Sequence, residues 1–283
     1  MERRAVDTEV RMFMRALRDG FTWWWGKLAC SLFASILGAL NPFFAVAVGL
    51  AVWGISGNLP SLMAELPFAI IAGAVLCAAS NAWPLSLAAL DMQRRAVDGE
   101  QVYFREWLPN ALRSVRRLFL PSLGLTALYA LPAFVLAFGG LFWFFSIGIP
   151  FLRYLVAALA AGLYLMLLLS QFYLLPLVVS NPELKAGFAL KAGFRLLVAE
   201  PFPAFGLFLI DSVLLALLVS GRIFPFLVYY GLSPMLRLAL YREVIARYGG
   251  GDRPSETTVD SGAAAEKSAW ATLMRRRGEG GGK

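Results

Sequence analysis

The chain has 283 residues, of which 59% are hydrophobic and only 16% are charged. Soluble domains carry about 45–50% apolar and about 25% charged residues, so this composition, with a mean hydropathy of +0.66, excludes a water-soluble globular fold. The apolar runs are too long and too continuous for barrel strands, and we therefore expect an all-α integral membrane protein.

The net charge of +8 at pH 7 raises the question of nucleic-acid binding, because basic domains often bind nucleic acid. No recognition motif for DNA or RNA accompanies the basic residues. Basic side chains also set membrane topology and contact anionic lipid headgroups, each contributing on the order of 1 kcal/mol near the surface. We therefore predict the lipid bilayer, and not nucleic acid, as the partner of these charges.

Six apolar runs are long enough to cross a bilayer, which takes about 20 residues each. They form a predicted membrane domain over 29–248, between a cytoplasmic amphipathic segment at 1–28 and a glycine-rich, flexible cytoplasmic tail at 249–283. The six spans are predicted at 29–55, 66–90, 119–146, 151–179, 201–220 and 223–243.

The distribution of Lys and Arg predicts how the chain is threaded. Of the 26 basic residues, all but Arg153 and Arg222 lie in three segments, 1–28, 91–118 and 180–200, or from position 237 onward. Basic residues near the ends of spans are retained in the cytoplasm. We therefore predict a multi-pass protein of a bacterial cytoplasmic membrane with both termini in the cytoplasm.

An Ala-Leu-basic triplet recurs before the first, third and fifth spans, at 16–18, 111–113 and 189–191. Each triplet lies in a charged amphipathic stretch with apolar residues at helical spacing. Such a helix lies in the headgroup plane with its apolar face toward the acyl chains, or packs that face against the end of the helix bundle. The repeat predicts three hairpins of two spans, each preceded by a cytoplasmic interfacial amphipathic helix.

Two groups of side chains are the predicted membrane-surface contacts. Trp and Lys anchor spans at the interface, and arginines on the polar face of an amphipathic helix reach phosphate. The residues are Trp23, Trp24, Trp25 and Lys27 in "WWWGK", and Arg113, Arg116 and Arg117 in "WLPNALRSVRRLF".

Two stretches resemble the YesL-like family of bacterial membrane proteins. The run "PLSLAALDMQRRAVDGEQVYFREWLPNALRSVRRLF" at 84–119 is similar to the link between that family's first hairpin and the rest. The run "NPELKAGFALKAGFRLLVAEPFPAFGLFLI" at 181–210 is similar to its later cytoplasmic connection. The resemblance implies the polytopic architecture and, because members are often associated with carbohydrate uptake, a link to solute uptake. It supplies no catalytic residues.

The residues needed for common catalytic chemistry are missing. The chain has no histidine, which excludes His-based zinc sites and Ser-His or Cys-His nucleophiles. It contains neither a phosphate-binding GxxxxGK[ST] loop nor a dinucleotide GxGxxG motif. Asp211 is the only acid deep within a predicted span, so paired intramembrane carboxylates are absent. We predict no enzymatic activity, no catalytic residue, no metal and no cofactor.

Asp211, in "LFLIDSVLLALL", is the most unusual polar residue of the predicted spans. About ten residues of helix at 1.5 Å each would place it near the middle of a hydrocarbon core about 30 Å thick. A bare charge there costs on the order of 2.5–3.5 kcal/mol, so the side chain should face the bundle. Either it is a proton or cation site with Asn81 and Gln171 lining the path, or it hydrogen-bonds across helices to Asn81, Gln171 or Tyr229.

These observations predict an integral membrane protein without enzymatic activity, acting as an accessory or scaffold subunit linked to solute (carbohydrate) uptake. Its expected partners are the anionic bilayer and another membrane or transport subunit. The alternative is a small secondary carrier or channel in which Asp211 is the proton or cation site.

Overall fold

The computed structural model describes residues 2–39, 41, 66–100, 106–219 and 223–249. The predicted tail beyond Gly249 and most of the second half of the first predicted span lie outside these residues. Among the described residues all elements are helices. They are α1 (Glu2–Gly26), α2 (Leu28–Ala39), α5 (Leu66–Ser80), α6 (Pro84–Val97), α7 (Trp107–Ser146), α8 (Pro150–Ser180), α9 (Ala186–Ala199), α10 (Pro201–Val219) and α11 (Ile223–Gly249).

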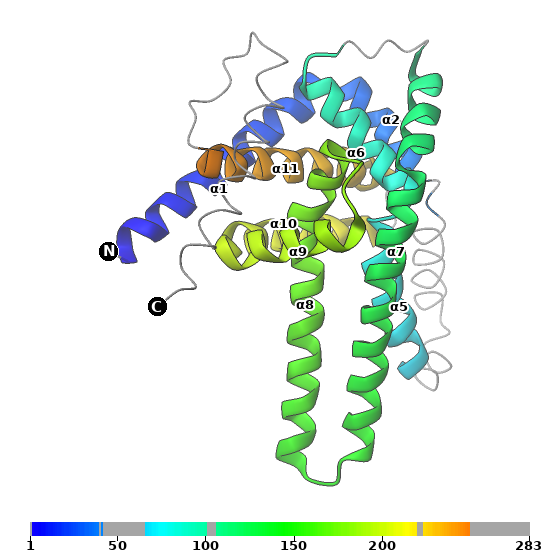
Figure 1. Ribbon diagram of the computed structural model, residues 1–283, viewed down its shortest axis with the longest axis vertical. Coiled ribbons are helices and arrows are strands. Elements are labelled where there is room, and N and C mark those ends of the chain that lie inside the picture. Colours follow the sequence, from blue (N-terminus) through cyan, green and yellow to red (C-terminus); the bar gives the residue numbers. More distant parts are fainter. Residues whose placement is uncertain (1, 40, 42–65, 101–105, 220–222, 250–283) are drawn as a thin grey trace.

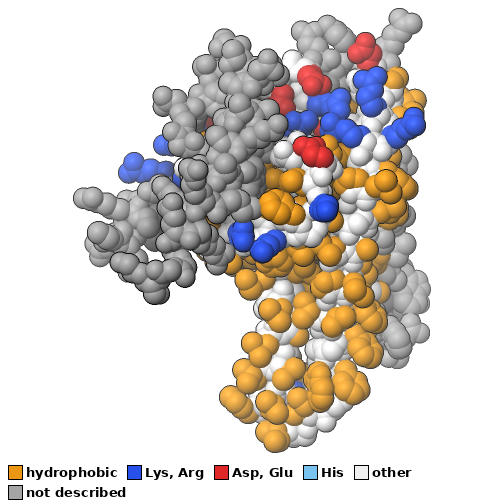
Figure 2. Space-filling model, in the orientation of Figure 1, with side chains coloured by type: hydrophobic (Ala, Val, Ile, Leu, Met, Phe, Trp, Pro, Cys, Tyr) orange, Lys and Arg blue, Asp and Glu red, His pale blue; other side chains and the backbone are white. Residues whose placement is uncertain are grey.

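A long antiparallel hairpin of α7 and α8 forms the axis of the molecule, with α5 beside it (Figure 1). Helices α1, α9, α10 and α11 gather at one end of this hairpin, and we call them the platform; α9 and α11 run crosswise to the hairpin. The half of α8 near the turn is largely exposed as far as Met166, whereas Leu167 and most of the following residues to Val179 are buried. Apolar side chains cover the free end of the hairpin, and charged side chains gather at the opposite end (Figure 2).

Three segments of the described chain are long and apolar enough to cross a membrane: Ile70–Val97, Trp107–Ser146 and Pro150–Ser180. A fourth is obtained if α9 and the first part of α10, as far as Leu214, are taken as one span bent by 100°. By their length and composition, these segments are compatible with a helical membrane protein. These segments do not establish the six spans and three hairpins that the sequence predicts.

Helix α1 packs its apolar face against the other helices of the platform. Ala16 is fully buried in a core with residues of α10 and α11. A Cβ added to Gly20 would lie 2.7 Å from Leu236 Cδ2, and one added to Gly206 would lie 2.7 Å from the Phe13 ring, so small residues allow close helix contact, as is common in membrane proteins. Of the two alternatives left open for this amphipathic helix, the structure shows packing against other helices.

The amphipathic stretch before the third span does not form a separate interfacial helix, contrary to the prediction. It is the first part of α7, which runs unbroken from Trp107 to Ser146 over 40 residues, about 60 Å. The physical reason is Asp91 of α6, which is fully buried and accepts hydrogen bonds from Ser114 Oγ at 2.7 Å and from the Arg117 guanidinium at 2.6 Å. This contact holds the start of α7 against α6 and keeps it in line with the span.

The second predicted span, 66–90, is also different from the expectation, because the helix is interrupted. Helix α5 ends at Ser80, and α6 begins at Pro84. Proline has no N–H to continue the hydrogen-bond ladder and is favoured at the first position of a helix. The interruption brings polar backbone groups to the point where α5, α6 and α8 meet.

Two glycines of α9 provide a matched test of the contact between α8 and α9. A Cβ on Gly193 would lie 2.8 Å from Leu174 Cβ, whereas a Cβ on Gly187 would have nothing within 4 Å. We expect Gly193→Ala to cost about 1–3 kcal/mol through overpacking and to lower the melting temperature in detergent. Gly187→Ala should leave it unchanged or raise stability by up to about 1 kcal/mol. Equal effects of the two substitutions would contradict the α8–α9 contact.

A second prediction concerns the buried carboxylate of α6. Asp91→Asn removes the charge that Arg117 and Arg95 bind, the latter at 3.2 Å, and breaking a buried ion pair costs about 3–5 kcal/mol. The matched control is Asp19→Asn, because Asp19 pairs with an Arg18 side chain that is 71% exposed, and such pairs contribute less than about 1 kcal/mol. In thermal unfolding, the purified Asp91→Asn variant should have a clearly lower melting temperature than Asp19→Asn. Similar melting temperatures would show that the ion pairs of Asp91 do not stabilise the protein.

Candidate polar junction and the arginines of α11

The interruption between α5 and α6 is closed by side chains from other segments. The Ser80 carbonyl accepts hydrogen bonds from Asn41 Nδ2 at 2.7 Å and from Ser86 Oγ at 2.9 Å. The Ala78 carbonyl accepts one from Gln171 Nε2 of α8 at 2.7 Å. Carbonyls at a helix end have no partner within the helix, and in an apolar environment each unsatisfied group is costly. These contacts supply the missing donors.

Asn81 and Gln171, two of the predicted site residues, are brought together by this junction. Asn81 Nδ2 donates to Gln171 Oε1 at 3.0 Å. The Gln171 amide thus binds at both ends, to Asn81 and to the Ala78 carbonyl. The pair joins α8 to the end of α5, and its geometry is that of an inter-helix brace.

Asp211, the third predicted site residue, is paired with a cation of α11. Its carboxylate lies 2.5 Å from the Arg237 guanidinium, and the two side chains are only 13% and 7% exposed. The guanidinium also lies over the Phe172 ring of α8, with 5.0 Å between Arg237 Cζ and the ring centroid. The expected hydrogen-bond partners of Asp211 were Asn81, Gln171 or Tyr229, and Arg237 was not among them.

Arg237 is the first of three arginines at five-residue intervals on α11. Five residues turn a helix by about 500°, so successive arginines point to different sides. Arg237 binds Asp211 of α10, and Arg242 binds Asp98 at the end of α6. Arg242 also lies over the Trp23 ring of α1, at 5.2 Å from its centroid.

The third arginine, Arg247, binds Glu200 at the bend between α9 and α10. The Arg247 guanidinium lies 2.6 Å from Glu200 Oε1, which also accepts a hydrogen bond from Tyr248 at 3.0 Å. Burial raises the pKa of Tyr248 to about 12, and the Glu200 charge adds to the rise, so this hydroxyl keeps its proton at neutral pH. Tyr173 of α8 donates to the Glu200 backbone carbonyl at 2.6 Å. The bend is therefore fixed to both α8 and α11.

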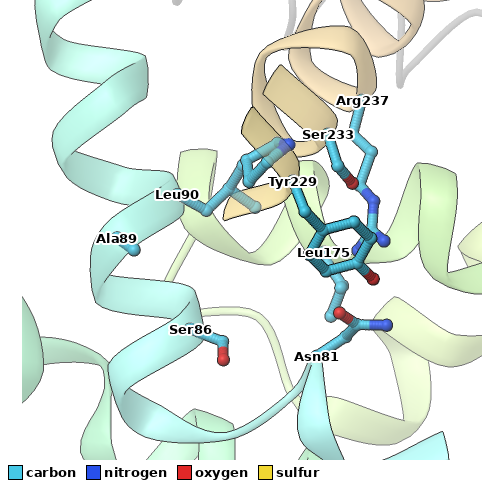
Figure 3. A pocket seen from close by; sticks show the side chains of 9 residues that line it. Asn81, Ser86, Ala89, Leu90, Leu175, Tyr229, Ser233 and Arg237 are labelled. Atoms are coloured by element: carbon cyan, nitrogen blue, oxygen red, sulfur yellow. The ribbon is translucent and has the colours of Figure 1, made fainter. Parts of the chain in front are cut away.

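A small cavity of about 30 Å³ lies between the polar junction and α11. Tyr229, Ser233 and Arg237 of α11 face Asn81 across it (Figure 3). One water molecule needs about 10–15 Å³ of such volume, so the cavity has room for about two waters. Sites for drug-sized ligands measure about 300–1,000 Å³, and a sugar would not fit here.

The predicted membrane-surface residues fall into two groups. Trp25, 70% exposed, lies at the surface, as do the exposed side chains of Lys27, Arg113 and Arg116. The others contact protein: Trp23 stacks with Arg242, Trp24 lies against Gly231, and Arg117 binds Asp91.

Three carboxylates that organise the structure were not among the predicted site residues: Asp91, Asp98 and Glu200. A signal was present for Asp91, since it follows an apolar run directly and precedes Arg94 and Arg95 at helical spacing. Within the residues that the structure describes, no three His, Cys, Asp or Glu side chains are placed to hold a metal ion.

Replacement of Asp211 and Arg237 by neutral amides should show whether their ion pair stabilises the fold. Asp211→Asn leaves a buried unpaired guanidinium, and we expect a loss of about 3–5 kcal/mol. The double variant Asp211→Asn, Arg237→Gln carries two neutral amides and should recover most of this loss. The coupling between the two substitutions, measured by thermal unfolding in detergent, should exceed about 1 kcal/mol. Additive effects would show that the two side chains do not depend on each other.

Comparison of the chain with protein-family models, with curated proteins and with solved structures finds no match. The resemblance to the YesL-like family stays a prediction from the two stretches quoted above.

Proposed function

We propose that this chain is a non-enzymatic accessory or scaffold subunit of a bacterial cytoplasmic membrane, with both termini in the cytoplasm. The observation that carries the proposal is the Asp211–Arg237 contact of 2.5 Å. An ion-coupling carboxylate has to gain and lose its proton or cation during transport. Arg237, a permanent cation, already supplies the counter-charge that an exchanged proton or cation would otherwise provide to Asp211.

The cavity and the polar junction support the same role. A cavity of about 30 Å³ admits water but no sugar, and Asn81 and Gln171 bind each other and a helix end. A scaffold needs polar groups that fix one arrangement of helices, and this is what their contacts do. The link to carbohydrate uptake comes from the family resemblance.

The platform offers the surface for a partner subunit. On α1, Met14 is 58% exposed, and Arg11, Arg15 and Arg18 are exposed around it. An apolar side chain surrounded by cations fits an acidic, partly apolar surface of a neighbouring membrane or transport subunit.

The proposed side of the termini does not depend on whether α10 and α11 cross the membrane. If neither helix crosses, the number of spans falls from six to four, and an even number of spans leaves both termini on the same side.

The carrier alternative predicts an ion flux that depends on Asp211. Purified protein in vesicles loaded with a dye for the ion tested, a pH-sensitive dye for protons or a cation-sensitive dye for cations, should give no flux above that of empty vesicles under an imposed gradient. The double variant Asp211→Asn, Arg237→Gln, which lacks the carboxylate but keeps a neutral pair, should be identical. A flux that the native protein supports and the double variant loses would establish the carrier and remove the scaffold proposal.

The scaffold proposal has its own positive test in cells. A photoreactive amino acid at Met14 should give one discrete cross-linked product. The control position is Leu159, which is 59% exposed on α8 and should give none, because it lies on the apolar hairpin. Absence of a product at Met14, in protein that is present in the membrane at normal level, would contradict a partner at this surface.

A further inference from the structure

Two points of α10 that are eleven residues apart lie at nearly the same position along the axis of α8. At its start, Tyr173 of α8 donates a hydrogen bond to the Glu200 carbonyl at 2.6 Å. Eleven residues later, Asp211 binds Arg237, which lies over Phe172. Eleven residues of helix extend about 16 Å, yet Glu200 contacts Tyr173 of α8 directly and Asp211 is linked to the neighbouring Phe172 through Arg237 of α11. A helix parallel to α8 would be linked to residues far apart on it, so these contacts indicate that α10 crosses α8.

The level of this crossing matches one boundary of a bilayer. From Phe151, at the turn of the α7–α8 hairpin, to Phe172 is 21 residues of unbroken helix, about 32 Å. The hydrocarbon core of a bilayer is about 30 Å thick. When the hairpin turn lies at one boundary of the core, α10 lies at the other.

The outer face of α10 is an exposed apolar stripe at helical spacing, i, i+3, i+7 and i+11. Its members are Phe202, Phe205, Leu209 and Val213, which are 45%, 44%, 51% and 60% exposed.

The polar side chain beside this stripe, Ser212, forms its hydrogen bond within the helix. Ser212 is exposed, but its hydroxyl donates to the Phe208 carbonyl of the same helix at 2.8 Å, which satisfies it within the helix. The opposite face of α10 is buried through Ala204 and Leu207, which pack with residues of α1, α8, α9 and α11.

We propose that α10 lies in the plane of the membrane, within the cytoplasmic leaflet, and that its apolar stripe contacts lipid acyl chains there. The occupant is lipid because the chain is anchored in the bilayer by the α7–α8 hairpin, and this anchor sets α10 at the level of the headgroup boundary. Basic side chains lie along the border between the apolar end and the charged end of the molecule (Figure 2), where anionic headgroups would meet them. In this arrangement the bend between α9 and α10 does not form a span, and Asp211 and Arg237 lie near the boundary of the core.

Depth measurements with spin labels test this arrangement. Single cysteines are introduced at Phe202, Phe205, Leu209 and Val213 in a background where Cys30 and Cys77 are alanine, after its melting temperature has been checked. The labelled proteins are reconstituted in vesicles of phosphatidylethanolamine and phosphatidylglycerol. Collision with oxygen and with a water-soluble nickel complex then reports the depth of each label. For an in-plane helix we expect four equal depths, about 5–10 Å below the phosphates.

The competing arrangements give different results. A crossing α10 would produce a depth that changes by about 16 Å between positions 202 and 213, which overturns the proposal. Labels open to the nickel complex, or shielded from both reagents, would show that water or a protein partner, including a second copy of the chain, covers the stripe, and would overturn it as well. Labels at Leu159 and Arg113 give, for comparison, the depth of the apolar hairpin and that of a predicted headgroup contact. The readout involves neither ion flux nor cross-linking, so its outcome is separate from that of the proposed function.

Discussion

The pairing of the three arginines of α11 with acids from other segments is the constraint on which the rest of the structure depends. In an apolar chain each buried charge needs a counter-charge, because desolvation of an unpaired ion costs several kcal/mol. Arg237, only 7% exposed, finds its counter-charge on α10. Arg242 and Arg247, which are 38% and 37% exposed, pair with acids at the end of α6 and at the bend before α10. Successive arginines point to different sides of α11, so the three pairs connect α11 to three different segments.

The sequence predicts the class of protein and part of the polar junction. Long apolar runs allow only helices in a membrane, and polar side chains within such runs seek each other, which is why Asn81 and Gln171 meet. The partner of Asp211 could not be predicted in the same way. Arg237 was counted with the basic residues that set topology, and nothing in one sequence distinguishes an arginine at a membrane surface from one paired inside the protein.

The differences between predicted and observed helix boundaries are caused by specific side-chain contacts. The start of α7 has the apolar periodicity of an interfacial helix, but the same periodicity suits a helix that packs on α6, and the choice is made by the buried Asp91. The interruption after Ser80 depends on donors from Asn41 and Gln171, which are distant in sequence. Hydropathy measures the apolar character of each run and carries no information about these contacts.

The position of Asp211 illustrates why the count of residues along a run is a poor measure of depth. That count places the carboxylate mid-membrane only if α10 crosses the bilayer, and the contacts of Glu200 and Arg237 with adjacent residues of α8 favour a helix that runs across instead. A charge near the boundary of the core costs less to place in the membrane than one at its centre, although the Asp211–Arg237 pair itself is largely buried within the protein, at 13% and 7% exposed. The acid in the apolar run is then a consequence of where α10 lies: the chain can keep an Asp–Arg pair there because that level of the membrane tolerates it, and the pair in turn fixes α10 to α11.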